Sequence, residues 1–268
     1  MEGNSYLPRT AGQLAFGTDA AGYHDGRIGY PDELFDAIFA RTVRRPRILE
    51  IGAGTGLATR SLLARAPADV VVVESDPALV RYLKDNFDDP NLTIINSSFP
   101  DAQVTGTFDL IVCAAAFHWL DPQAALARVR DLLAPDGVWA MWWNAYRNPG
   151  HGDRLAQAIT PMLAGVALPP SEGPHGHYSL DVDLHTDTLH RAGFYGVQPL
   201  LFRRERTLDA AAVRALYESY SYVRALPDPQ RKKLLDDITQ VVTDEFGGMA
   251  PNIVLTAAYS AVAVERPR

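Results

Sequence analysis

The first half of the chain alternates short apolar runs with segments in which apolar positions recur at helical spacing. The apolar runs predict strands at 47–51, 70–74, 92–96, 108–113 and 138–143. The helical spacing predicts helices at 32–41, 55–65, 77–86 and 122–133. This order predicts an α/β fold in which a mostly parallel sheet carries helices on both faces. APDGVW at 134–139 predicts a helix stop and a turn before the fifth strand, with Gly137 at the bend.

The pattern is looser in the second half of the chain. NPGHGD at 148–153 and LPPSEGPHGHYSL at 168–180 are rich in glycine and proline, which predicts mobile segments around a short helix at 154–163. The remaining predicted elements are a strand at 197–207, helices at 210–224 and 230–246, and a last strand at 253–264. We expect one domain over residues 1–268 with a partial cap over its site. The cap segments are 1–31, 145–193 and 209–252.

Composition is that of an ordinary globular protein, with 47% hydrophobic and 21% charged residues among 268. A formal net charge of −7 is unfavourable for a broad phosphate-neutralising surface, so we expect no nucleic-acid partner. The chain has no run of 18 apolar residues, and MEGNSYLPRT does not resemble a secretory leader. We therefore expect no membrane partner and a cytoplasmic location.

Neither cysteine nor histidine offers a metal site in the sequence. The single cysteine, Cys113, lies in the apolar run FDLIVCAAAF, so we expect a buried, inert thiol and no intrachain disulfide. His175 and His177 in HGHY are two residues apart in a flexible-looking loop, with no third ligand at a known distance. We expect no bound metal.

The stretch RILEIGAGTGLAT places Gly52, Gly54 and Gly56 after the first predicted strand. Glycine at such a turn allows backbone angles and a close ligand approach that a Cβ would obstruct. The spacing is not the G-x-G-x-x-G of dinucleotide sites, because the third glycine comes one residue early. Glu50, just before the glycines, would repel a diphosphate but attract a ligand with ammonium and sulfonium groups, such as S-adenosylmethionine.

A second acid, Glu74, ends the next apolar run in VVVVESDP. Its two oxygens can accept hydrogen bonds from ribose hydroxyls. Asp76 stands two residues later, at the predicted start of a helix, and is expected to be an N-cap.

Four stretches in this order resemble the successive motifs of class I S-adenosylmethionine-dependent methyltransferases: ILEIGAGTG, VVVVESDP, FDLIVCAAAFHWLDP and LLAPDGVWAMWWN. The resemblance implies a Rossmann-like seven-stranded sheet of order 3-2-1-4-5-7-6 with the last strand antiparallel, and S-adenosyl-L-methionine as cofactor. AFHWLDP and FGTDAAGYHDGRIGYPDEL further resemble the small-molecule branch that includes trans-aconitate methyltransferase-like enzymes.

The resemblance also implies the cofactor contacts. Glu50 would reach the methionine ammonium, Glu74 would hold the ribose, and Arg27 can pair with the methionine carboxylate. Pro100 replaces the acid that relatives often carry at that position, and Asp101 is the substitute for the adenine contact. The predicted cofactor residues are Tyr23, Arg27, Glu50, Gly52, Ala53, Gly54, Glu74, Ser75, Ser98, Phe99 and Ala114.

His118 follows the fourth strand, at the sheet edge where open α/β folds bind ligands. Three roles stay open for it: a base that takes a proton from a hydroxyl, a donor that orients a carboxylate, or a structural tether of its loop. Strand alternation sends Trp142 and Trp143 to opposite faces, so one of them is expected to line the pocket. The predicted acceptor contacts are His118, Trp119, Asn144, Tyr146, Arg147, Tyr220 and Ser221.

The function predicted first is methyl transfer to a small-molecule acceptor, at a carboxylate or hydroxyl oxygen, by in-line displacement. Transfer to nitrogen or carbon of a natural-product intermediate or peptide, a dinucleotide oxidoreductase, and a catalytically silent nucleotide-binding module are the alternatives. A carboxylate needs no base, whereas a hydroxyl benefits from one. The sequence therefore identifies the methyl donor better than the acceptor, and it does not indicate an oligomeric state.

Overall fold

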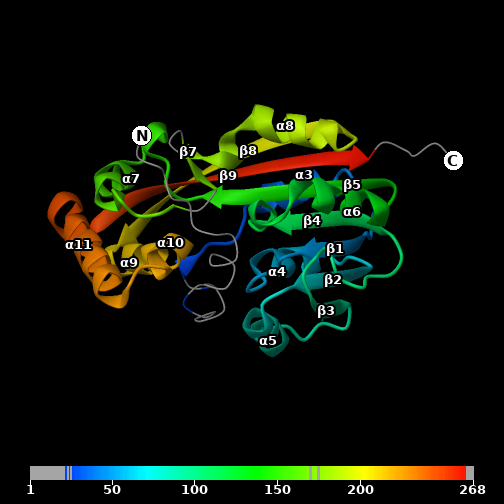
Figure 1. Ribbon diagram of the computed structural model, residues 1–268, viewed down its shortest axis with the longest axis horizontal. Helices are drawn as coiled ribbons and strands as arrows, with labels where there is room; N and C mark the ends of the chain where they lie inside the picture. Colours follow the sequence, from blue (N-terminus) through cyan, green and yellow to red (C-terminus); the bar gives the residue numbers. More distant parts are fainter. Residues whose placement is uncertain (1–21, 23, 25, 169–170, 174–175, 264–268) are drawn as a thin grey trace. The chain divides into compact units, whose positions relative to one another are not determined.

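Seven strands form one sheet in the order β3-β2-β1-β4-β5-β9-β8 (Figure 1). Their bounds are β1 Arg47–Ile51, β2 Asp69–Glu74, β3 Leu92–Asn96, β4 Phe108–Ala114, β5 Leu133–Ala145, β8 Phe194–Asp209 and β9 Met249–Ala263. The pairs among β1 to β5 are parallel, and the β9 arrow runs opposite to those of β5 and β8. The predicted order 3-2-1-4-5-7-6 with an antiparallel last strand is confirmed.

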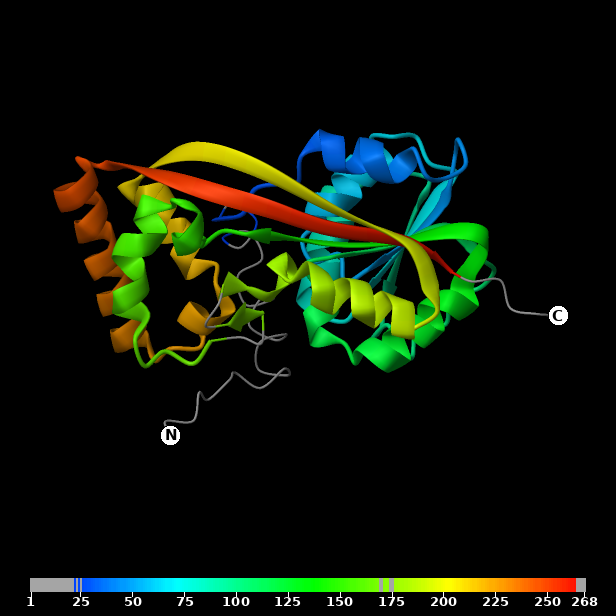
Figure 2. The ribbon, with the colours of Figure 1, turned by 90° about the horizontal axis from the view of Figure 1, so that it is seen from above.

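The structure is a computed structural model that describes residues 22, 24, 26–168, 171–173 and 176–263. Its helices are α3 Asp32–Phe39, α4 Leu57–Leu63, α5 Pro77–Asn86, α6 Pro122–Leu132, α7 Arg154–Ile159, α8 Val182–Arg191, α9 Ala210–Glu218, α10 Ser221–Arg224 and α11 Asp228–Phe246. Short 3₁₀ turns are η2 Phe117–Trp119, η3 Pro149–His151, η4 Thr160–Leu163 and η5 Tyr178–Leu180, and β6 Glu172–Gly173 pairs with β7 Gly176–His177. Figure 2 shows α3 on one face of the sheet and α6 and α8 on the other, so the predicted placement of helices on both faces is confirmed.

The chain divides into two compact units. We call them the sheet unit, which comprises Gly29–Asn144, Asp181–Phe202 and Thr256–Arg268, and the helical unit, which comprises Met1–Ile28, Ala145–Leu180 and Arg203–Leu255. The strands β5, β8 and β9 each contribute residues to both. That the predicted cap segments cover a site stays a prediction.

The sheet unit has a core between β-strands and the helices α3 and α4. Leu34 and Phe35 of α3 and Leu62 of α4 are fully buried against strand residues that include Trp142. Asp76 accepts a hydrogen bond from the backbone N–H of Ala78 at 2.8 Å, so the predicted N-cap of α5 is confirmed. In the helical unit a separate apolar cluster joins α7, α9, α10 and α11 with Leu208 of β8 and with Ala250 and Val254 of β9.

The turn predicted at 134–139 is wrong in part, because β5 already begins at Leu133 and includes these residues. The pairing of β4 with β5 shifts register between Phe108 and Leu110, where the extra residues are absorbed. Asp136, not Gly137, takes the positive φ, of 60°. Gly137 is needed for a different reason: a Cβ there would lie 2.8 Å from the Ala134 carbonyl oxygen.

No helix was predicted for α8, which belongs to the sheet unit. Asp181 caps it by accepting from the backbone N–H of Leu184 at 2.9 Å, and His185 and Leu189 are its buried residues. Two buried positions in VDLHTDTLHR form too narrow an apolar stripe for the periodicity to reveal the helix.

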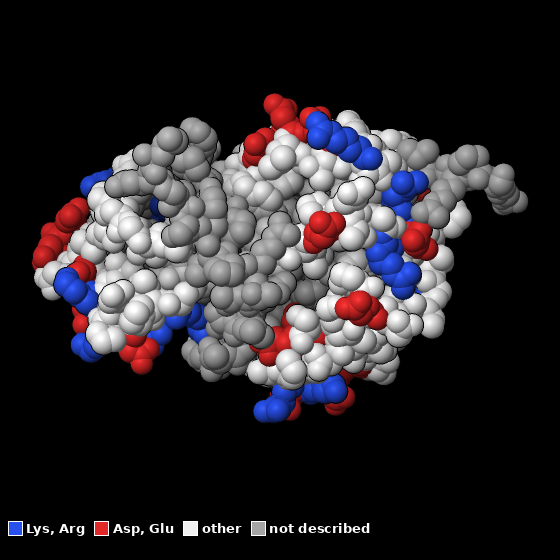
Figure 3. All heavy atoms as spheres, viewed as in Figure 1, with Lys and Arg blue, Asp and Glu red and all other residues white. Residues whose placement is uncertain are grey.

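Positive and negative side chains are interspersed on the described surface of the face shown in Figure 3.

The Cys113 thiol is fully buried, which raises its pKa, and this confirms the expected inert cysteine. Across the part of the chain that the structure describes, no helix is long and apolar enough to cross a membrane. The absence of a nucleic-acid partner stays a prediction.

Candidate functional site

The turn from β1 to α4 holds three glycines in the left-handed backbone region. Gly52, Gly54 and Gly56 have φ of 69°, 60° and 83°. A Cβ on Gly52 would lie 2.6 Å from the Ala116 side chain, and one on Gly56 would overlap the Phe87 ring. A Cβ on Gly54 would meet no protein atom within 4 Å. Packing therefore explains two of the glycines, and only Gly54 leaves the backbone open towards a ligand.

Glu50 is fully buried within β1. The Thr59 hydroxyl of α4 donates to Oε2 at 2.6 Å, while Oε1 is buried and has no hydrogen-bond partner. Burial raises the pKa of this carboxyl from 4.5 to about 7; the Thr59 hydrogen bond opposes the rise, and the charge of Glu74 adds to it. A buried carboxylate oxygen without a partner is costly, so Oε1 fits a ligand that supplies a cation or a donor.

Glu74 ends β2 and is also buried. Its Oε2 accepts the backbone N–H of Gly54 at 2.9 Å, and its Oε1 accepts the backbone N–H of Asp76 at 2.9 Å and the Ser75 hydroxyl at 3.4 Å. Glu74 thus joins the glycine turn to the start of α5. Oε2 accepts one hydrogen bond and has a second lone pair that can accept a ribose hydroxyl; this contact stays a prediction.

The turn after β3 contains the predicted adenine contacts. Phe99 is buried, while Ser98 is exposed and donates its hydroxyl to Asp101 at 2.5 Å. Asp101, the substitute expected because of Pro100, therefore already accepts a hydrogen bond within its own turn.

The turn after β4 approaches the glycines. Ala114 ends the strand, and Ala115 takes a φ of 54° while its N–H donates to the Trp142 carbonyl at 2.7 Å. A non-glycine residue in this region marks a backbone constrained by its surroundings. The buried Ala53 accepts the N–H of Gly56 at 2.9 Å, which closes the glycine turn.

His118 lies on η2, directly after this turn, and is half-buried. The indole Nε1 of Trp143 donates to its Nδ1 at 3.1 Å, and the Trp119 ring lies 4.5 Å from the imidazole, between ring centroids. Trp142 points the other way and packs edge-on against Phe35. The expected separation of the two tryptophans is confirmed, and Trp143 is the one beside His118.

Asn144 is the last residue of β5 in the sheet unit and is buried. Its Oδ1 accepts the Thr256 hydroxyl at 2.6 Å, and its Nδ2 donates to the Gly29 carbonyl at 3.3 Å. The amide thus links β5 to β9 and to the segment before α3. A contact with the acceptor stays a prediction.

The other predicted acceptor residues, Tyr146, Arg147, Tyr220 and Ser221, belong to the helical unit and are all buried. Arg147 is not solvated, and its Nη1 donates to the Thr160 hydroxyl at 3.2 Å. Predicted acceptor residues thus occur in both units, and that they line one site stays a prediction.

Arg27 lies between two aromatic faces in the helical unit. Its Cζ is 4.7 Å from the ring centroid of Tyr146 and 4.7 Å from that of Tyr220, and its Nη2 donates to the Ser219 carbonyl at 3.3 Å. Cation–π contacts of this kind stabilise a guanidinium away from water. Tyr23 lies outside the described residues.

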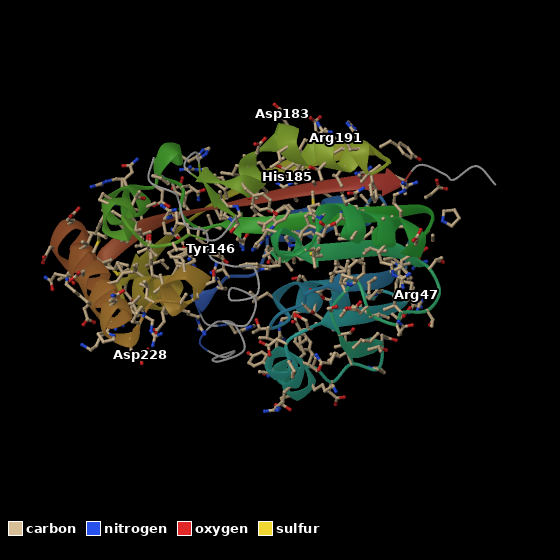
Figure 4. The ribbon with its side chains drawn as sticks, viewed as in Figure 1. Arg47, Tyr146, Asp183, His185, Arg191 and Asp228 are labelled. Carbon is tan, nitrogen blue, oxygen red and sulfur yellow. The ribbon has the colours of Figure 1, made fainter. Side chains whose placement is uncertain are left out.

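Arg206 of β8 was not predicted as a site residue. Its Cζ lies 5.7 Å from the ring of Tyr146, which Figure 4 labels, and its Nε donates to Asn252 Oδ1 at 2.9 Å. Its Nη2 is buried without a partner. Burial lowers the pKa of Arg206; neighbouring tyrosines oppose this, and the charges of Arg204 and Arg27 lower it further. Arg204 and Arg206 are half-buried and alternate with the exposed Arg203 and Glu205 along β8, so they lie on the same face of the strand.

Comparisons with known proteins agree with this geometry. The family model described as a methyltransferase domain matches residues 48–137. An uncharacterized methyltransferase of Schizosaccharomyces pombe is 25% identical over 256 residues, which cover 91% of this chain and 95% of the relative. A malonyl-[acyl-carrier protein] O-methyltransferase of Paenibacillus sp. is 25% identical over 270 residues, 93% of this chain and 96% of the relative. A methyltransferase structure from Thiobacillus denitrificans, in complex with S-adenosyl-L-homocysteine, shares the fold with a TM-score of 0.56 at 14% identity, covering 97% of this chain and 100% of that one.

The chain is a class I S-adenosylmethionine-dependent methyltransferase, and S-adenosyl-L-methionine is its cofactor. The residues present fit that cofactor, since Glu50 Oε1 has no partner and Gly54 leaves open space at the turn. Membership of the trans-aconitate methyltransferase-like branch stays a prediction.

Proposed function

We propose that this methyltransferase acts on a small acidic molecule and transfers the methyl group to an oxygen, a carboxylate or a hydroxyl. The observation that carries the proposal is the guanidinium of Arg206, whose buried Nη2 has no hydrogen-bond partner. The Arg206 side chain is half-buried, and a charged N–H group that is removed from water without a hydrogen-bond partner is costly. An acidic acceptor would supply the missing anion.

The surroundings of Arg206 also support recognition of an acidic acceptor. Arg27 lies over the ring of Tyr146, which Arg206 also contacts, and over that of Tyr220. Burial lowers the pKa of Arg206, and the positive charges of Arg204 and Arg27 lower it further. A planar guanidinium binds a carboxylate through two parallel hydrogen bonds, which suits recognition of an acid. The malonyl-[acyl-carrier protein] relative, whose name states transfer to oxygen, agrees with this chemistry.

The cofactor supplies a methyl group already activated on a sulfonium. We infer that Glu50 attracts the ammonium of the methionine portion and that Glu74 accepts the ribose hydroxyls. Gly54 lets this portion approach the backbone, because no side chain projects from it. The protein then has to align the acceptor, exclude water and, for a hydroxyl acceptor only, remove a proton.

The test is a methyl-transfer assay with a panel of small carboxylic acids and their uncharged amides, run on wild-type protein and on Arg206→Gln. We expect transfer to acids and not to amides, and a rise of ~10–150-fold in acceptor KM for Arg206→Gln, as for loss of a charged hydrogen bond. The affinity for S-adenosylmethionine, measured by titration calorimetry, should stay unchanged. A variant that loses cofactor affinity instead would assign Arg206 to the methionine carboxylate and overturn the proposal.

A further inference from the structure

One ring nitrogen of His118 has a donor aimed at it. Trp143 Nε1 lies 3.1 Å from His118 Nδ1. An indole N–H can only donate, so Nδ1 has to present its lone pair. In a neutral imidazole with a lone pair on Nδ1, the proton is carried by Nε2.

The packing of neighbouring rings fixes the orientation of the Trp143 indole. It is buried, and its ring stacks on His185 of α8 with centroids 5.2 Å apart and an interplanar angle of 26°. His185 is buried too, points from α8 towards the sheet (Figure 4), and lies 4.5 Å from the Tyr259 ring of β9. The indole therefore cannot turn its N–H away from His118 without disturbing these packed rings.

This arrangement favours a hydrogen-bond donor over a base at His118. A base needs a lone pair on Nε2, which in a neutral ring requires a proton on Nδ1. That proton would face the N–H of Trp143, so two donors would oppose each other. The same conflict disfavours the doubly protonated ring. His118 is thus arranged to donate from Nε2.

We propose that Trp143 is a positioning residue that holds His118 in the Nε2–H tautomer, and that His118 donates a hydrogen bond to an acceptor carboxylate. The tautomer follows from contacts within the sheet unit, whereas the carboxylate rests on the proposed function. The carboxylate oxygen forms the new O–C bond as the C–S bond breaks and its electron pair stays on sulfur. No proton is released, so no base is required. A hydroxyl acceptor would release a proton that an Nε2–H ring cannot take.

The tautomer can be read without any acceptor by ¹⁵N NMR of histidine-labelled protein. We expect His118 Nδ1 to give the signal of an unprotonated nitrogen and Nε2 that of a protonated one. Trp143→Phe keeps an aromatic ring for His185 but removes the N–H, and His118 should then populate both tautomers. Trp142→Phe is the matched control, because the buried Nε1 of Trp142 has no partner to lose. A proton on Nδ1 in the wild type, or an unchanged tautomer in Trp143→Phe, would overturn the proposal.

The donor role is tested by kinetics with the best acid of the panel. His118→Gln places an amide N–H near the position of Nε2 but provides no base. We expect it to stay within about tenfold of wild-type kcat/KM, whereas His118→Ala loses ~10–150-fold, the range for a charged hydrogen bond. Trp143→Phe should raise acceptor KM by ~2–13-fold, as for loss of one neutral hydrogen bond, with kcat nearly unchanged.

The outcomes separate this inference from the proposed function. If His118→Gln is as inactive as His118→Ala and both lose ~10²–10⁴-fold, His118 is a base and the inference fails while acid methylation stands. If the wild type methylates only hydroxyl compounds, the carboxylate acceptor is wrong for both proposals, and the NMR result still decides the tautomer.

Discussion

The sheet unit and the helical unit each hold a charged group with one buried atom that its surroundings do not satisfy. In the sheet unit it is Glu50, partly compensated by the Thr59 hydroxyl and by a pKa raised to about 7. In the helical unit it is Arg206, partly compensated by the Tyr146 ring and the Asn252 amide. Each retains one buried polar atom without a partner.

The difference in sign indicates a division of labour. A buried carboxylate suits the cationic methyl donor, whereas a half-buried guanidinium suits an anionic acceptor. If this division holds, variants around Glu50 and Glu74 should change cofactor affinity and spare acceptor KM, and variants around Arg206 should do the reverse. The five predictions below test the sheet-unit half of that comparison.

The largest effect is expected for Gly54→Val. Valine at a φ of 60° is strained by about 1–3 kcal/mol, and its side chain would also occupy the space from which the cofactor approaches. The strain should lower the melting temperature, and the steric exclusion of the cofactor from its contacts should lower its affinity in titration calorimetry by more than about 100-fold.

Gly247→Val is the matched control for strain, because Gly247 has a φ of 62° and equally open space at the end of α11 in the helical unit. It should lower the melting temperature by a similar amount and leave cofactor affinity unchanged. Equal losses of affinity in the two variants would show that Gly54 serves only the fold.

The next effect is expected for Glu74→Ala, which removes the acceptor for the Gly54 N–H and the predicted ribose contact. Charged hydrogen bonds contribute about 1.5–3 kcal/mol, so cofactor affinity should weaken by ~10–150-fold while acceptor KM stays the same. Asp69→Ala on the same strand removes an acid that pairs with Arg47 instead, and its cofactor affinity should match the wild type. An unchanged affinity in Glu74→Ala with the fold intact would remove Glu74 from the cofactor site.

A smaller effect is expected from pH through Glu50. In the folded state, burial raises the pKa of the Glu50 carboxyl from its ordinary value of 4.5 to about 7. Only the ionised form of this carboxyl attracts an ammonium group. Cofactor affinity should therefore fall about tenfold from pH 8 to pH 6, in calorimetry at constant ionic strength. Glu50→Gln should bind weakly with no such dependence. A wild-type affinity that is flat over this range would contradict the role of Glu50.

The Glu50 carboxyl should also make the free energy of unfolding depend on pH. The folded state binds the Glu50 proton more tightly than the unfolded state, so the free energy of unfolding should decrease as pH rises from 4.5 to about 7, by ~3 kcal/mol at most. Without cofactor, Glu50→Gln should consequently unfold at higher denaturant concentration than the wild type at pH 8 and show little advantage at pH 4.5.

The smallest effect is expected for Asp76→Ala, which removes the N-cap of α5. Loss of such a cap costs about 1 kcal/mol, so the melting temperature should fall by about 2–4 °C. Cofactor affinity should change by less than in Glu74→Ala, because Asp76 holds Glu74 through its backbone N–H, which alanine retains. A larger loss of affinity in Asp76→Ala would make this side chain a cofactor contact.

The sequence by itself determined the alternation of strands and helices and the glycine turn with its two acids. Residues Arg47–Ile51, Leu92–Asn96 and Pro77–Asn86 were predicted to the residue. These features depend on neighbours along the chain, since apolar periodicity and the conformational freedom of glycine are local properties. The order of the strands came from the resemblance of the motifs rather than from periodicity.

Only the tertiary structure decided how the buried polar groups are satisfied. The partners of His118 and Arg206 are 25 and 46 residues away along the chain, and His185 lies on a helix whose narrow apolar stripe the pattern did not reveal. Whether a histidine accepts or donates, or an arginine keeps a buried N–H without a partner, depends on which distant side chain packs beside it. Residue type and spacing place such a group at a sheet edge, but contacts between distant segments determine its chemistry.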